Sequence, residues 1–245
     1  MIVFIGVDLG WYGKPTGLAA LHYATSALEQ HAITRLEPVA EILDWISQQI
    51  GDEDAVVGVD APLVIPNSSG IRRAERELNA EYRRYHAGCH AANLSRPFAP
   101  NVLAFSRALS ERGFAHGAEA SPRQPGRFQI EVHPHSATVA LFGLPRIVKY
   151  KRGRREDRSR ELRRLRRLML ERLPALDPPF VPDLPRIPLS GNLKAVEDQI
   201  DAVLCAYIAA HWWKWGRQRN AVFGSNQEGY IVVPKRGAYS PPSCL

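Results

Sequence analysis

The 245-residue sequence has few cysteines and no long apolar run, and both absences narrow the class of protein. The three cysteines, Cys89, Cys205 and Cys244, are scattered without a Cys-x-x-Cys pair, which argues against a disulfide framework or a structural zinc site. No apolar stretch approaches the roughly 20 residues of a membrane span. The N-terminal stretch reaches Asp8 too early for a signal peptide. We therefore expect a cytoplasmic protein.

Glycine motifs that bind nucleotide phosphates are also missing, because the chain has neither a dinucleotide fingerprint nor a P-loop. Hydrophobic residues make up 45% of the chain and charged residues 23%, which is typical of an ordinary globular protein. The length is sufficient to bury a sizeable core. We predict a single domain over residues 1–245, with insertions at about 64–100 and 144–190.

The positive charge is unevenly distributed. The net charge is +7, and most of the surplus lies in residues 146–167, RIVKYKRGRREDRSRELRRLRR. Such a block indicates a polyanionic partner, with nucleic acid as the first candidate. A solvated helix face with a flexible basic loop is the common alternative. The candidates for binding substrate phosphates in this block are Lys149, Lys151, Arg152 and Arg154.

Two apolar runs each end in Gly-Val-Asp. The first leads to Asp8 and the second, over 55–59, leads to Asp60. Runs of this kind predict strands buried on both faces, and a carboxylate that closes a buried strand is costly unless it is paired or functional. The alternative is an Asp that caps the following turn. Strands over 18–23 and 28–36 and a helix over 39–50 predict an antiparallel meander and a crossover, which would place Asp60 beside Asp8.

The pattern over 192–215 predicts the strongest helix in the chain. Asp198 and Asp201 lie three residues apart near its start, so both carboxylates face one side. Asp201 adjoins the apolar stripe through Ile200 and Leu204, which predicts that it is the more buried of the two. Favourable placement of acids near a helix N-terminus is the alternative, and it explains Asp198 better than Asp201.

A short strand predicted over 128–132 alternates in character, so Glu131 and His133 point the same way. His133 could move a proton. His86 and His90 flank Cys89 in a stretch predicted to be a loop, where a metal site would need further ligands. The sequence pattern over 222–233 predicts a hairpin near the C-terminus.

The order of these motifs resembles the ribonuclease H-like fold, and more closely a family of predicted ribonuclease H-like nucleases catalogued as a domain of unknown function (DUF429-like). The motifs are GVDLGW at 6–11, GVDAPL at 58–63, EVHP at 131–134, YKRGR at 150–154, EDQIDAVLCAY at 197–207 and EGYIVVP at 228–234. They span nearly the whole chain. The resemblance implies an α/β fold with a mixed sheet flanked by helices, helical insertions, a C-terminal hairpin and a metal-carboxylate site.

The chemistry of such a site is hydrolysis of a phosphodiester. Two divalent ions roughly 3.5–4 Å apart can activate a water and stabilise the leaving oxygen, and Mg²⁺ or Mn²⁺ prefers carboxylate oxygens. The expected metal ligands are Asp8, Asp60, Glu131, Asp198 and Asp201. The expected catalytic residues are Asp8, Asp60, Glu131, Asp201 and His133. Glu41, in the first predicted helix, is a rival to Glu131.

Crowded carboxylates repel one another. Neutralising Asp201 is therefore expected to leave the metal-free protein as stable as before, or slightly more stable. The leading hypothesis is a divalent-metal-dependent nuclease or phosphodiesterase. Two alternatives stay open. One is a non-catalytic nucleic-acid-binding protein that uses the basic block. The other is an ATP-dependent phosphotransferase of the actin-like superfamily, suggested by Lys14 and Gly17 after Asp8, although such a chain would need a duplicated domain.

Overall fold

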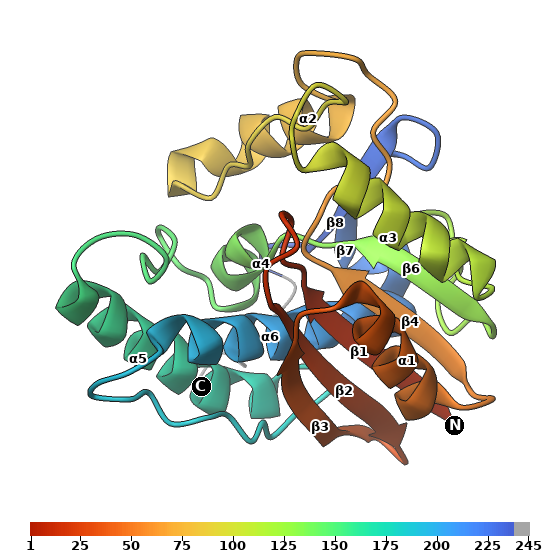
Figure 1. Cartoon of the computed structure of the whole chain (residues 1–245). Helices are drawn as coiled ribbons and strands as arrows, with labels where there is room; N and C mark the ends of the chain where they lie inside the picture. The colour runs from red at the N-terminus through yellow and green to blue at the C-terminus, as the bar shows by residue number, and fades with distance from the viewer. Residues whose placement is uncertain (238–245) are drawn as a thin grey trace.

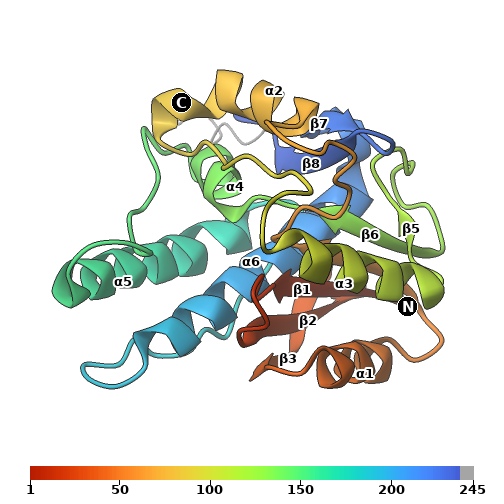
Figure 2. The ribbon, with the colours of Figure 1, turned by 45° about the horizontal axis from the view of Figure 1, so that its top comes forward.

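A six-stranded mixed sheet forms the centre of the computed structural model, which describes residues 1–237, so that Cys244 lies outside the described residues. The strand order is β3-β2-β1-β4-β6-β5 (Figures 1 and 2). The strands are β1 (Ile2–Asp8), β2 (Thr16–Ala24), β3 (Ala27–Leu36), β4 (Asp54–Val59), β5 (Ala115–His116) and β6 (Arg127–Glu131). Strands β1 to β3 form the predicted antiparallel meander, and β4, β5 and β6 run parallel to β1.

The two Gly-Val-Asp strands are direct neighbours in the sheet. Strands β1 and β4 pair in parallel with Gly6 opposite Gly58 and Val7 opposite Val59. The backbone N–H of Asp60 donates to the carbonyl oxygen of Val7 over 2.9 Å, which continues the pairing past the end of β4. Asp8 and Asp60 therefore leave the sheet side by side, as the sequence predicts.

Helices cover both faces of the sheet (Figures 1 and 2). Helices α1 (Val39–Ile50) and α3 (Ala99–Glu111) pack on one face, and alternate residues of β1, such as Val3 and Ile5, join their core. Helices α4 (Pro134–Leu141), α5 (Arg155–Arg172) and α6 (Leu193–Trp215) belong to the core on the other face, together with Phe4. Strand β1 is thus buried on both faces, and the predicted fold class, an α/β sheet flanked by helices, is confirmed.

The C-terminal hairpin forms a second, smaller sheet. Its strands are β7 (Asn220–Ser225) and β8 (Gly229–Pro234), and helix α2 (Arg73–Tyr82) packs against them. Single 3₁₀ turns follow three of the helices, at η1 (Arg83–Tyr85), η2 (Leu173–Ala175) and η3 (Gly216–Gln218). The predicted C-terminal hairpin is confirmed. Across residues 1–237, no helix has both the length and the apolar character needed to cross a membrane.

Helix α6 lies unusually close to the sheet because glycines face it. A Cβ atom on Gly6 would stand 1.8 Å from the carbonyl oxygen of Ala202, and one on Gly58 would stand 2.7 Å from that of Cys205. Each of these glycines precedes its strand-end aspartate by two residues. The Gly-Val-Asp repeat therefore has a packing function as well as a polar one, since it brings α6 and its acids next to Asp8 and Asp60.

Candidate functional site

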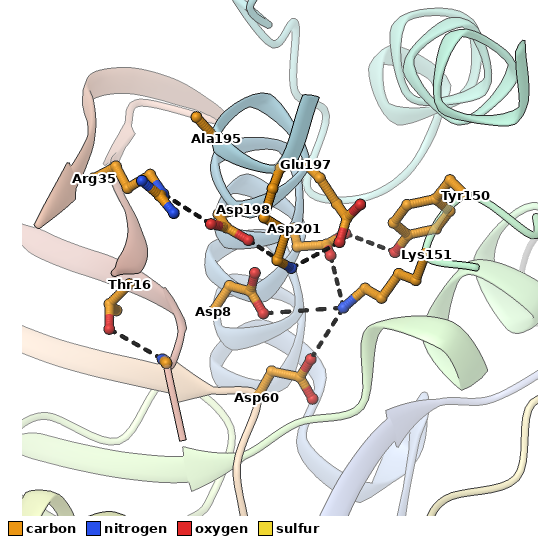
Figure 3. A network of polar contacts seen from close by, with 12 residues as sticks. Asp8, Thr16, Arg35, Asp60, Tyr150, Lys151, Ala195, Glu197, Asp198 and Asp201 are labelled. Atoms are coloured by element: carbon orange, nitrogen blue, oxygen red, sulfur yellow. Dashed lines mark hydrogen bonds and ion pairs between the residues drawn. The ribbon is translucent and has the colours of Figure 1, made fainter. Parts of the chain in front are cut away.

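Three carboxylates meet around the ammonium group of Lys151 (Figure 3). Asp8 ends β1, Asp60 follows β4, and Asp201 lies in α6. From Nζ of Lys151 the distance is 2.8 Å to Oδ2 of Asp201, 3.9 Å to Oδ2 of Asp60 and 4.0 Å to Oδ1 of Asp8. We call these four residues the carboxylate cluster. The structure thus brings together the three aspartates that the strand ends and the late helix predict to be neighbours.

Asp201 is the most deeply buried acid of the cluster, with no exposed surface. Its Oδ1 accepts a hydrogen bond of 2.7 Å from the hydroxyl of Tyr150, while its Oδ2 faces Lys151. Burial, and then the nearby Asp201 carboxylate, raise the pKa of Tyr150, so its hydroxyl stays protonated and donates. Two consecutive residues of one loop therefore hold both oxygens of this carboxylate.

Burial raises the pKa values of two acids in the cluster. It raises the pKa of Asp8 well above its usual value and that of Asp60 to about 6. The Lys151 ammonium counteracts this rise in both carboxyls, and the Asp201 carboxylate adds to it. The Lys151 ammonium lies within 4.0 Å of all three carboxylates, and Lys194, which pairs with Asp198, also lowers the pKa of Asp8 and of Asp60. A further cation would relieve the mutual repulsion of the acids.

Asp198 does not join this cluster, although it also lies near the start of α6. Its Oδ2 lies 2.8 Å from Nε of Arg35, and its Oδ1 lies 2.7 Å from Nζ of Lys194. Its neighbour Glu197 pairs with Lys194 and with Arg158 of α5. The second acid of the predicted pair is thus engaged by its own cations, and it ties α6 to β3 (Figure 3).

Glu131 is held by a buried arginine rather than by the cluster. Nη2 of Arg72 lies 2.6 Å from Oε1 of Glu131, and Nη1 lies 2.9 Å from Oε2. Nε of the same guanidinium lies 2.6 Å from Oε1 of Glu75. The backbone N–H of Leu63 also donates to Glu131, over 3.1 Å. Because Leu63 follows Asp60 by three residues, this network fixes the course of the loop that leaves β4.

Glu131 and His133 both line a pocket of about 630 Å³, which borders the cluster at Asp60 and Lys151. Oγ of Ser136 donates to the carbonyl oxygen of Ala87 and lies 2.8 Å from Nδ1 of His133. A hydroxyl carries one proton, so Nδ1 of His133 must be the donor in that contact, which leaves Nε2 as an acceptor. Burial lowers the pKa of His133 to about 3, so the ring is neutral near pH 7.

The predicted phosphate-binding residues divide into two groups. Lys149 and Arg152 are exposed and line the pocket, and Lys151 belongs to the pocket wall and to the cluster. Arg154 precedes the first turn of α5, outside the pocket lining. Glu41, the rival to Glu131, is exposed in the first turn of α1.

The carboxylate cluster suits a hard divalent ion in its donor chemistry. Oδ2 of Asp201 is buried, accepts no hydrogen bond, and faces a cation. Within the described chain, however, no three His, Cys, Asp or Glu side chains form a ready metal site, and Lys151 stands among the three aspartates. Asp8, Asp60 and Asp201 therefore fit a metal on the condition that the Lys151 ammonium withdraws.

Sequence reasoning missed the partners of these acids. Lys151 and Tyr150 lie in the YKRGR motif, which was assigned only to phosphate binding. Arg72 lies in a strongly charged stretch that gives no local sign of burial, yet its side chain is 1% exposed. The ion pairs of Lys194 are the ones that local sequence indicates. Lys194 lies three residues before Glu197 and four before Asp198, so the three side chains share one helix face.

The ion pair with Lys151 bears on the expectation that neutralising Asp201 leaves the metal-free protein as stable as before, since that expectation considers only repulsion among the acids. The ammonium already offsets part of the crowding, so an Asn at position 201 would remove the partner of a cation.

A family model described as "Protein of unknown function (DUF429)" matches residues 6–226 of the chain. The match spans Asp8, Asp60, Lys151 and Asp201. No curated protein matches the chain.

Proposed function

We propose that this chain, which belongs to the DUF429 family of proteins of unknown function, is a divalent-metal-dependent nuclease or related phosphodiesterase. One observation carries the proposal. The Lys151 ammonium lies within 4.0 Å of carboxylate oxygens from three aspartates, at the end of β1, just after β4 and in α6, at the edge of a pocket with one basic wall. The proposal includes a ribonuclease H-like fold. It rests on the site rather than on that fold, because fold alone does not determine function.

Asp8, Asp60 and Asp201 are the residues that would hold Mg²⁺ or Mn²⁺. When bound, such an ion supplies an acidified water and stabilises charge on the leaving oxygen. The Tyr150 hydroxyl orients the Asp201 carboxylate before any ion binds, and the pairing of β1 with β2 fixes the backbone of Asp8 beside it. Asp198 and Glu131 support the site indirectly, through Arg35 and Arg72.

Lys151 has two positions in this proposal. In the metal-free protein its ammonium neutralises part of the cluster. When it withdraws, its long side chain carries the charge toward Lys149 and Arg152, which share the pocket wall with it. There it binds the phosphate of the substrate. Nε2 of the neutral His133 is left to accept a hydrogen bond from a ligand in the same pocket.

The proposed location is the cytoplasm. Cys89 and Cys205 are free thiols in the described chain. Unpaired cysteines fit a reducing compartment.

A cleavage panel tests the function. Single-stranded, duplex, hybrid and branched nucleic acids are incubated with the protein and Mg²⁺ or Mn²⁺. We expect metal-dependent cleavage of at least one substrate, with loss of cleavage in Asp8→Asn. Asp52→Asn neutralises an exposed acid outside the cluster and serves as the matched control. Cleavage that persists undiminished in Asp8→Asn would contradict the proposal.

A second candidate, nucleic-acid binding without catalysis, is favoured by a basic groove on α5. Arginine side chains dominate its lining, which consists of Arg163, Arg166, Arg167, Leu170, Arg186 and Ile187. Binding through this groove would need no metal and would weaken steeply with salt. Metal-independent binding without cleavage would favour this candidate.

The alternative of phosphate transfer from ATP rests on Lys14 and Gly17. Packing of α6 explains Gly17 without ATP, because a Cβ there would stand 2.0 Å from the carbonyl oxygen of Asp198.

A further inference from the structure

The pocket that borders the carboxylate cluster has the size of a small-molecule site. Its volume is about 630 Å³, within the range of about 300–1,000 Å³ that is usual for organic ligands. Asp60 and Lys151 belong both to the cluster and to the pocket lining. A ligand whose phosphate lies beside the cluster, on the basic side of the pocket, therefore has room for one organic group.

The positive charge of the pocket lies on one wall. Lys149, Lys151 and Arg152 come from a single segment of four residues. Nη2 of Arg152 lies 3.5 Å from Nε2 of His90, so this segment meets the loop that carries His90. Exposed lysine and arginine side chains next to a cation-binding cluster are suited to bind a phosphate. The phosphate of a ligand is thus directed to this wall.

Arg72 also lines the pocket, but four of its five guanidinium N–H groups are already engaged. Its Nε is taken by Glu75 and its Nη2 by Glu131, while Nη1 is shared between Glu131 and the carbonyl oxygen of Val64. Two carboxylates balance its single charge. The part of the pocket beside Glu131 therefore attracts no anion and is left for the uncharged part of a ligand.

The remaining walls combine flat rings with apolar side chains. Trp11, Pro62 and Ile231 supply apolar surface, and the imidazole rings of His133 and His135 also line the pocket. Nδ1 of His135 is buried without a hydrogen-bond partner, and Nε2 of His133 is left as an acceptor. A planar heterocycle with polar atoms along its edge can stack and hydrogen-bond in such surroundings.

We propose that this pocket binds one organic phosphate of mononucleotide size, either free or as the end of a strand, with its phosphate on the wall of Lys149 and Arg152. The proposal rests on the proposed function and specifies its substrate class. The enzyme would then act on a small phosphodiester or on a chain end, because the pocket admits one nucleotide unit rather than the backbone of a duplex.

Isothermal titration of the full chain, without added metal, tests the pocket directly. The probes are the four 5′-ribonucleoside monophosphates, inorganic phosphate and the four nucleosides. We expect at least one monophosphate to bind at least tenfold more tightly than inorganic phosphate or its own nucleoside. Arg152→Ala and His90→Ala each remove an exposed side chain of the wall and should weaken that binding at least fivefold. Arg112→Ala removes an equal charge at the end of α3, outside the pocket, and should bind as wild type.

Competition separates the two ligand sources. A linear single strand that displaces the monophosphate while a circular one does not assigns the pocket to a chain end, and displacement by neither assigns it to a free small molecule. Monophosphates that bind no more tightly than inorganic phosphate would overturn the proposal. So would an Arg112→Ala variant as impaired as Arg152→Ala. Metal-dependent cleavage without monophosphate binding overturns the pocket assignment alone, whereas monophosphate binding without any cleavage supports the pocket and overturns the proposed activity.

Discussion

Nζ of Lys151 lies 2.8 Å from Oδ2 of Asp201, while the preceding residue, Tyr150, donates to Oδ1 of the same carboxylate. A pair of adjacent loop residues thus holds a helix carboxylate from both sides. The Lys151 ammonium also lies within 4.0 Å of carboxylate oxygens from Asp8 and Asp60. The position that a divalent ion would neutralise is therefore occupied by a side chain of the protein itself, and this relationship makes metal binding and the position of Lys151 mutually dependent.

Replacing Lys151 by Met should destabilise the metal-free protein and strengthen Mn²⁺ binding. The variant keeps an apolar side chain of similar length but leaves three carboxylates without their shared cation. Because the Lys151 side chain is 28% exposed, we expect a modest loss of about 1–2 kcal/mol in the free energy of unfolding. Thermal melts with and without Mn²⁺ measure both effects. A Mn²⁺ shift in the variant no larger than in wild type would show that Lys151 does not compete with the metal.

Breaking the buried ion pair of Arg72 and Glu131 should lower the stability of the protein far more than breaking an exposed ion pair does. Glu131→Gln leaves a buried guanidinium with one carboxylate fewer, and breaking a buried pair in this way costs about 3–5 kcal/mol. Urea denaturation measures the loss. Asp157→Asn breaks an exposed pair with Arg160 and serves as the control, with a midpoint close to that of wild type. Equal losses in the two variants would contradict the structural importance assigned to the Arg72 network.

The cluster aspartates could be predicted because local patterns determine their positions. Two apolar runs of equal pattern give adjacent parallel strands, and the stripe beside Asp201 buries that residue. The ion pairs could not be predicted in the same way. Arg72 and Glu131 are 59 positions apart in the chain, and Lys151 lies in a loop without periodicity. Local pattern carries no information on which distant cation meets a buried acid, so Glu131 was expected among the metal ligands and lies instead against Arg72.

Local sequence also does not indicate short secondary-structure elements that depend on pairing with a distant strand. Strand β5 has two residues, Ala115 and His116. It exists because β6 offers it an edge to pair with, and no local preference indicates that. Helix α3 begins at Ala99 and contains Pro100 in its first turn, where proline is accepted because its missing N–H needs no helical partner.

His211 should make the protein less stable in mild acid. Burial lowers its pKa from 6.5 to about 4, so the folded protein keeps the ring neutral while the unfolded chain takes up a proton. Its contribution to stability is complete above about pH 6.5 and is lost as the pH falls toward 4, by roughly 3 kcal/mol in total. Urea unfolding of wild type and His211→Gln between pH 7.5 and 4.5 measures this slope.

The slope over that range should be smaller in His211→Gln than in wild type. The control is His90→Gln, which changes an exposed ring and should keep the wild-type slope. An identical slope in His211→Gln and wild type would mean that His211 titrates in the folded protein as it does in the unfolded chain.

The binding of a divalent ion by Asp8, Asp60 and Asp201 is tested most directly by the Mn²⁺-induced shift in melting temperature of Asp201→Asn. A ligand stabilises only the state that it binds. We predict that Mn²⁺ raises the melting temperature of wild type and of the control Asp52→Asn, and that the shift is lost in Asp201→Asn. A shift in Asp201→Asn as large as in wild type, or no shift in wild type, would contradict the account.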